Sequence, residues 1–216
     1  TSTKFVTGFA ANPGNTKIVH HVIAFIIDQG LVAEHQAMDD AEEGPGYTCF
    51  GGPGGNTFRM LGGWAPGGSG NDNPPGTGLR IEPGSMIAIQ VHYNVLEAGS
   101  ETDKTSIQVS YEDSVEKEAQ IIPWSNFVDW IFGRNMPIPA NDPDVVHAHA
   151  GDPTQFFTDD KDFTIYAAAL HMHNLGTKTS LSIERENGDS ECLLQIDRWD
   201  FQWQESYGLR EPTVFR

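Results

Sequence analysis

Two adjacent histidines, His20 and His21, lie inside an apolar run whose residue types predict a buried β-strand. The run extends from residue 18 to residue 27 and reads IVHHVIAFII, with turn-forming residues on both sides. A buried imidazole needs partners for both ring nitrogens, and a metal ion supplies one partner for each ring. The pair therefore predicts metal ligation, because packing alone explains two successive histidines in such a strand poorly.

A third imidazole for this site is available in a second strand-like run, residues 87–95, which contains His92. A single buried histidine is more often hydrogen-bonded to the protein than bound to a metal ion. The His20-His21 doublet makes metal binding by His92 the favoured interpretation, because His92 would complete a set of three ligands if the two strands are neighbours.

A second candidate pair is His171 and His173, which follow the apolar run 163–170. Residues i and i+2 of a strand share one face, and a rise of ~3.3 Å per residue places the two about 7 Å apart along the backbone. We expect this strand to present both imidazoles at its end, near solvent, where they can converge on one ion.

The other three histidines have less specific surroundings. His147 and His149 have the same spacing but lie in a segment rich in Pro and Asp. We interpret them as loop histidines, with accessory metal binding as the less favoured alternative. His35, between Glu34 and Gln36, is expected to be solvated.

Ligand type limits the choice of metal without deciding it. Imidazole ligands suit copper, zinc, nickel or iron, and the lack of nearby carboxylates disfavours calcium and magnesium. Three histidines fit catalytic zinc as well as copper, so spacing alone leaves those two metals open.

The elements that must position these side chains are predicted to be strands. The 216 residues include 23 glycines and 13 prolines, a density typical of short strands joined by turns. A first strand is predicted at 4–9, and a long insertion rich in Gly and Pro occupies 30–85. Further strands are predicted at 17–27, 86–95, 105–111, 162–173, 178–185, 191–196 and 199–204. We predict an all-β chain of two successive antiparallel β-sandwich domains, residues 1–115 and 116–216.

Charge and hydropathy exclude several classes of partner. Thirteen basic residues against thirty acidic ones give a net charge of −17, which disfavours nucleic acid and anionic membrane surfaces. No run approaches the roughly 20 apolar residues that span a bilayer, so no membrane span is expected. Cys49 and Cys192 either pair with each other or have partners outside this sequence.

Six short segments match one known family in the family's order. They are Pro13-Gly14-Asn15 leading into Val19-His20-His21-Val22, Gly63-Trp64-Ala65-Pro66-Gly67, Gly76-Thr77-Gly78-Leu79, Gln90-Val91-His92-Tyr93-Asn94, His171-Met172-His173-Asn174-Leu175-Gly176 and Trp199-Asp200-Phe201-Gln202-Trp203-Gln204. Together they resemble the copper type II, ascorbate-dependent monooxygenases, the family of peptidylglycine alpha-hydroxylating and dopamine beta-monooxygenases, and above all their bacterial members.

The resemblance implies two jelly-roll-like domains with one copper ion each. His20, His21 and His92 would hold the electron-donating copper, and His171 and His173 would supply two ligands of the oxygen-activating copper. Ascorbate would reduce both ions, and O2 would hydroxylate an aliphatic C–H of a small-molecule or peptide substrate. It also implies a secreted, periplasmic or cell-surface location.

The chain departs from the family at one ligand. The family's second copper has a methionine ligand downstream of its two histidines, whereas no methionine follows His173 here. The second domain is therefore expected to be truncated, to be completed by a missing segment on a partner chain, or to have lost its activity. The alternative functions are a non-catalytic copper-binding or cell-surface assembly module, and a metal-free ligand-binding jelly roll.

Overall fold

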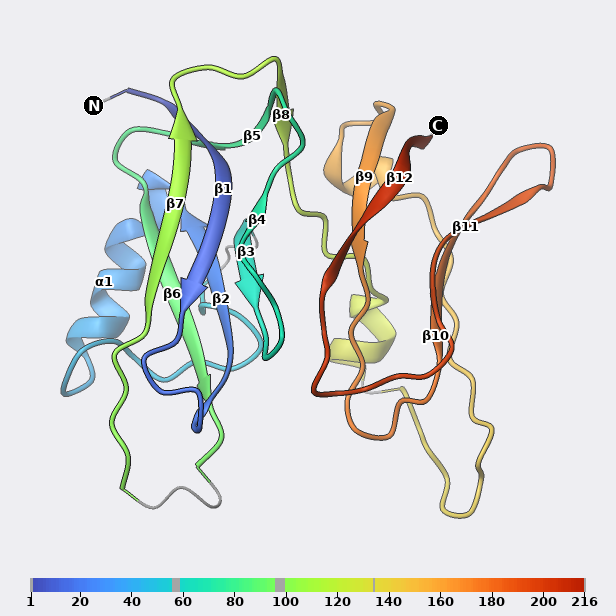
Figure 1. The fold of residues 1–216 in the computed structure, drawn as a ribbon, viewed down its shortest axis with the longest axis horizontal. Helices are drawn as coiled ribbons and strands as arrows, with labels where there is room; N and C mark the ends of the chain where they lie inside the picture. The colour runs from blue at the N-terminus through green and yellow to red at the C-terminus, as the bar shows by residue number, and fades with distance from the viewer. Residues whose placement is uncertain (1, 56–58, 96–99, 134, 216) are drawn as a thin grey trace. The chain divides into compact units, whose positions relative to one another are not determined.

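The fold is an all-β sandwich made of several separate sheets (Figure 1). The computed structural model describes residues 2–55, 59–95, 100–133 and 135–215. Strands predominate in these ranges, and the helices are few and short. The predicted fold class is thus confirmed.

Two sheets form the sandwich in the first half of the chain. One contains β1 (Lys4–Asn12), β4 (Asn71–Asp72), β5 (Thr77–Ile81), β7 (Ser106–Glu112) and β8 (Lys117–Ala119). The other is β3 (Met60–Trp64), β2 (Val19–Ile27) and β6 (Met86–Tyr93), with β2 in the middle. The strands predicted at 17–27, 86–95 and 105–111 are therefore present as β2, β6 and β7.

The main hydrophobic core lies between these two sheets. Val6 and Phe9 of β1 and Leu79 of β5 pack against residues of the other sheet, chiefly Ile26 of β2 and Leu61 of β3. Apolar residues run almost continuously through β2, whereas β1 also contains polar residues and glycine, which explains why β2 is the more buried of the two strands. The histidine doublet thus lies in a largely buried strand.

A helix lies inside the long insertion, although the Gly- and Pro-rich sequence of this segment favours loops. It is α1 (Val32–Asp40), preceded by the 3₁₀ turn η1 (Gln29–Leu31). The two other helical elements are the π-helical turn η2 (Phe127–Phe132) and α2 (Thr154–Phe157).

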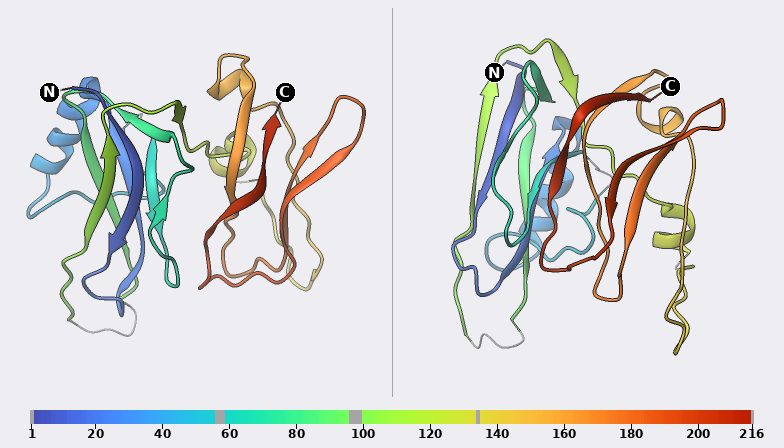
Figure 2. Two further views of the ribbon diagram at one scale, coloured as in Figure 1. Left: turned by 45° about the horizontal axis from the view of Figure 1, so that its top comes forward. Right: turned by 45° about the vertical axis from the view of Figure 1, so that its right-hand side comes forward.

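The remaining strands form two separate two-stranded sheets. β9 (Phe163–Ala169) pairs with β12 (Ser206–Phe215), and β10 (Thr179–Glu184) pairs with β11 (Ser190–Ile196) (Figures 1 and 2). The strand predicted at 199–204 is wrong, because this segment is a turn. Asp200 organises it by accepting from the backbone N–H of Gln202 through its side chain and from that of Trp203 through its carbonyl.

Contacts divide the chain into two compact units. The first comprises residues 1–121 and 166–210, and the second comprises residues 122–165 and 211–216. The predicted domain boundary at residue 115 is not tested by this grouping and stays a prediction. All five histidines of the predicted copper sites belong to the first unit.

Two further expectations concern the cysteines and the membrane. Cys49 and Cys192 are both free thiols. Within the described residues, no helix has the length and apolar character needed to cross a bilayer.

Candidate metal centre

Neighbouring strands bring three histidines together. His20 and His21 come from β2, His92 comes from β6, and His21 lies directly opposite His92 in the antiparallel pairing. Val19 and Val22 are fully buried on either side of the doublet and fix this part of β2 in the core. The two strands are neighbours, which was the condition for His92 to complete the set of three ligands.

A β-bulge lets two successive side chains join one cluster. Val19 pairs with Tyr93 and His21 pairs with His92, so β2 advances two residues while β6 advances one, and His20 is the extra residue. In a regular strand successive side chains would point to opposite faces. Here the Nδ1 atoms of His20 and His21 lie 3.1 Å apart.

The three imidazoles are close enough together to hold a single metal ion. Their ring centroids are 4.6 to 5.2 Å apart, and one ligand nitrogen from each ring lies within 4.8 Å of the others. It is the one group of three or more His, Cys, Asp or Glu ligands with such spacing in the described part of the chain. Three nitrogen donors fit a copper or zinc ion.

The electrostatics of the cluster favour neutral rings. Burial lowers the pKa of His21 to about 4, with His92 and His20 as further causes. Burial also lowers the pKa of His20, and the neighbouring His92 adds to the effect. Both rings are therefore uncharged at neutral pH and offer lone pairs, which is the protonation state that metal ligation needs.

The second predicted pair directly follows β9. That strand ends at Ala169, so His171 and His173 lie just beyond it and are exposed, with ring centroids 5.1 Å apart. His171 Nδ1 lies 2.6 Å from Gln204 Oε1, while the amide nitrogen of Gln204 donates to the carbonyl of Phe201. Because the amide oxygen can only accept, Nδ1 carries the proton and Nε2 presents a lone pair.

Phe201 contacts both histidine sets within the first compact unit. Its ring stacks on His20 at a centroid distance of 4.9 Å and meets His173 edge-on at 6.2 Å. His171 and His173 are also near enough to the doublet to contribute to the lowered pKa values of His20 and His21. The sequence alone assigned no role to Phe201 or Gln204. The one available signal was Asp200, a residue type that favours the turn in which both lie.

A methionine ligand for the second pair is not identified. Met172 folds back on its own loop, because a Cβ added at Gly176 would lie 2.9 Å from its sulfur.

The remaining histidines have different environments. His147 and His149 belong to the second compact unit, where both rings contact Trp130 and His149 also contacts Trp124. The prediction of a solvated His35 is wrong, since only 1% of this residue is exposed. Adjacent residues of a helix point about 100° apart, so a buried histidine can sit between polar neighbours.

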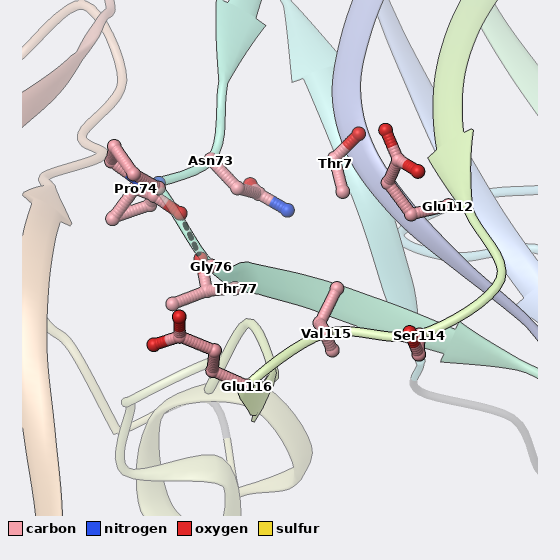
Figure 3. Close-up of a pocket in the computed structure, with 10 residues that line it drawn as sticks. Thr7, Asn73, Pro74, Gly76, Thr77, Glu112, Ser114, Val115 and Glu116 are labelled. Atoms are coloured by element: carbon pink, nitrogen blue, oxygen red, sulfur yellow. Dashed lines mark hydrogen bonds between the residues drawn. The ribbon is translucent and has the colours of Figure 1, made fainter.

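Two cavities of the structure have no histidine in their lining. One of about 450 Å³ is lined by Asn73, Thr77, Glu112 and Glu116 among others, and by none of the histidines (Figure 3). The Thr77 hydroxyl donates to the Pro74 carbonyl at its rim. A smaller cavity of about 60 Å³ is lined in part by Trp64 and Gln204, which places open space beside the partner of His171.

No protein-family model matches the sequence.

Proposed function

We propose that the protein is a copper-dependent monooxygenase that hydroxylates an aliphatic C–H with O2, using ascorbate as the reductant. The observation that carries the proposal is the convergence of His20, His21 and His92 on a point suited to one metal ion. The H-x-H pair in the same compact unit supports it. The ordered set of matching segments favours copper over zinc.

The chain's own residues would divide the work between two ion sites. His20, His21 and His92 would hold the electron-donating ion through neutral nitrogens, and His171 and His173 would supply two ligands of the other. Copper, when bound, supplies the one-electron chemistry that dioxygen reduction needs. Gln204 would keep Nε2 of His171 free by holding the proton at Nδ1.

The proposed substrate is a small molecule or a peptide, and the proposed location is secreted, periplasmic or at the cell surface. Both follow from the resemblance. A downstream segment or a partner chain would supply the missing thioether ligand, which would favour the reduced state of the ion.

Copper stoichiometry combined with oxygen uptake tests the proposal. We expect two tightly bound copper ions in the complete protein and oxygen consumption that requires both ascorbate and substrate. His20→Ala should remove one ion while the circular dichroism spectrum stays unchanged. His149→Ala, which alters an exposed histidine of the other unit, should leave the copper content unchanged. Absence of tight copper binding would refute the proposal.

A second candidate is a non-catalytic copper-binding or cell-surface assembly module. The observation that favours it is the lack of an identified third ligand for His171 and His173, with Met172 packed on Gly176. This candidate predicts one copper ion, held by His20, His21 and His92, and no oxygen consumption.

A further inference from the structure

The buried imidazole of His35 has one satisfied nitrogen. His35 belongs to α1, and its Nδ1 lies 2.7 Å from the hydroxyl oxygen of Tyr47. The Tyr47 hydroxyl in turn hydrogen-bonds to the carbonyl oxygen of Pro53. These three groups form a short chain that leads away from the ring.

The direction of this chain fixes the tautomer of His35. Tyr47 has one hydroxyl hydrogen, and burial raises the pKa of Tyr47, so the hydrogen is retained. The Pro53 carbonyl can only accept, so the hydrogen of Tyr47 points to it. The oxygen of Tyr47 must then accept from Nδ1–H of His35, and the other nitrogen, Nε2, presents a lone pair.

That lone pair is buried without a partner among the described residues. An unsatisfied buried polar atom destabilises the folded protein. Such an atom calls for an explanation, and an ion that completes the site is one.

A carboxylate reaches the same space. A Cβ added at Gly55 would lie 3.2 Å from Nε2 of His35 and 3.1 Å from Oε1 of Glu34. Gly55 has a φ of +61°, a conformation that favours glycine, and the missing side chain leaves this space open. One electron-pair donor from each of the two residues therefore borders the space that a side chain at position 55 would occupy.

We propose that His35 Nε2 and the Glu34 carboxylate bind a divalent transition-metal ion, with zinc the best match to this nitrogen and oxygen pair. Ligating histidines characteristically donate their second N–H to a fixed acceptor, which is the role of Tyr47 here. Water completes the coordination. The net charge of −17 favours cation binding at this helix. The site shares no residue with the proposed copper centre.

Zinc titration by calorimetry tests the site in the full-length chain. The background carries His92→Ala and His171→Ala, which remove a ligand from each proposed copper site. We expect a zinc ion to bind, and Glu34→Gln to weaken that binding by about tenfold or more, which corresponds to about 1.4 kcal/mol. His35→Gln should abolish it.

The matched control is Glu43→Gln, which removes the same charge from an exposed residue just after α1. It should leave the affinity nearly unchanged. Because His35 is a core residue, its variant can fail to fold, whereas the exposed Glu34 keeps the test decisive. Equal weakening by Glu34→Gln and Glu43→Gln, or no zinc binding in the background, would overturn the proposal.

Discussion

Acidification of the metal-free protein should destabilise it through His21. The folded protein does not protonate this ring until about pH 4, whereas the unfolded chain protonates it near its ordinary pKa of 6.5. Between these values the unfolded state binds more protons, so the free energy of unfolding falls as the pH is lowered. Below about pH 4 this contribution is constant.

The expected size follows from the pKa difference. A fall from 6.5 to about 4 corresponds to about 3 kcal/mol at ~1.36 kcal/mol per pH unit. The ring is only partly buried, so solvent screening reduces the expected loss to about 1–2 kcal/mol.

Urea unfolding at several pH values between 7 and 4 measures this contribution. The control is His21→Gln, which keeps the carboxylates, whose titration would otherwise obscure the effect. The wild type should lose about 1–2 kcal/mol more than the variant over this range. Parallel pH profiles of the two proteins would refute the assignment of a lowered pKa to His21.

Two further predictions concern packing around the site. Gly62→Ala places a Cβ 2.6 Å from the ring of Phe9 in β1 and should lower the free energy of unfolding by about 1–3 kcal/mol. The control is Gly63→Ala, whose Cβ has its nearest atom 3.6 Å away and should cause a smaller loss. Equal losses from the two variants would contradict the expected clash. Phe201→Ala removes the stack on His20 and should destabilise the metal-free protein by about 1 kcal/mol. Phe50→Ala, at a fully exposed ring, is its control in urea unfolding, and similar losses from both would exclude a role for the stack.

The strands that carry the site could be predicted because their residue types leave few alternatives. β2 and β6 are rich in β-branched residues between turn signals. Their adjacency could only be assumed, as the condition under which His20, His21 and His92 form one metal site. The bulge could not be predicted, since nothing in the letters of β2 indicates which residue lacks a cross-strand partner. Alternation alone would have separated His20 from His21.

Other features were hidden for different physical reasons. α1 lies among glycines and prolines and has a weak apolar face, so its sequence gives little helical signal. The burial of His35 depends on the distant Tyr47 and Pro53, which no local pattern reveals. The segment 199–204 is aromatic enough to resemble a strand, but Asp200 bends it, and only this turn brings Phe201 to His20.

Because of the extra residue in β2, the three-histidine cluster could be transferred to another protein with only two strands. One antiparallel ladder supplies every ligand, so transplanting β2 and β6 with their register into another sheet would carry the complete set. Deleting one residue between Val19 and Val22 would have the opposite effect: both residues there are histidines, so removing the bulge would also remove one of the three ligands. A designed copy of the site therefore needs the β-bulge at His20 as well as the three histidines.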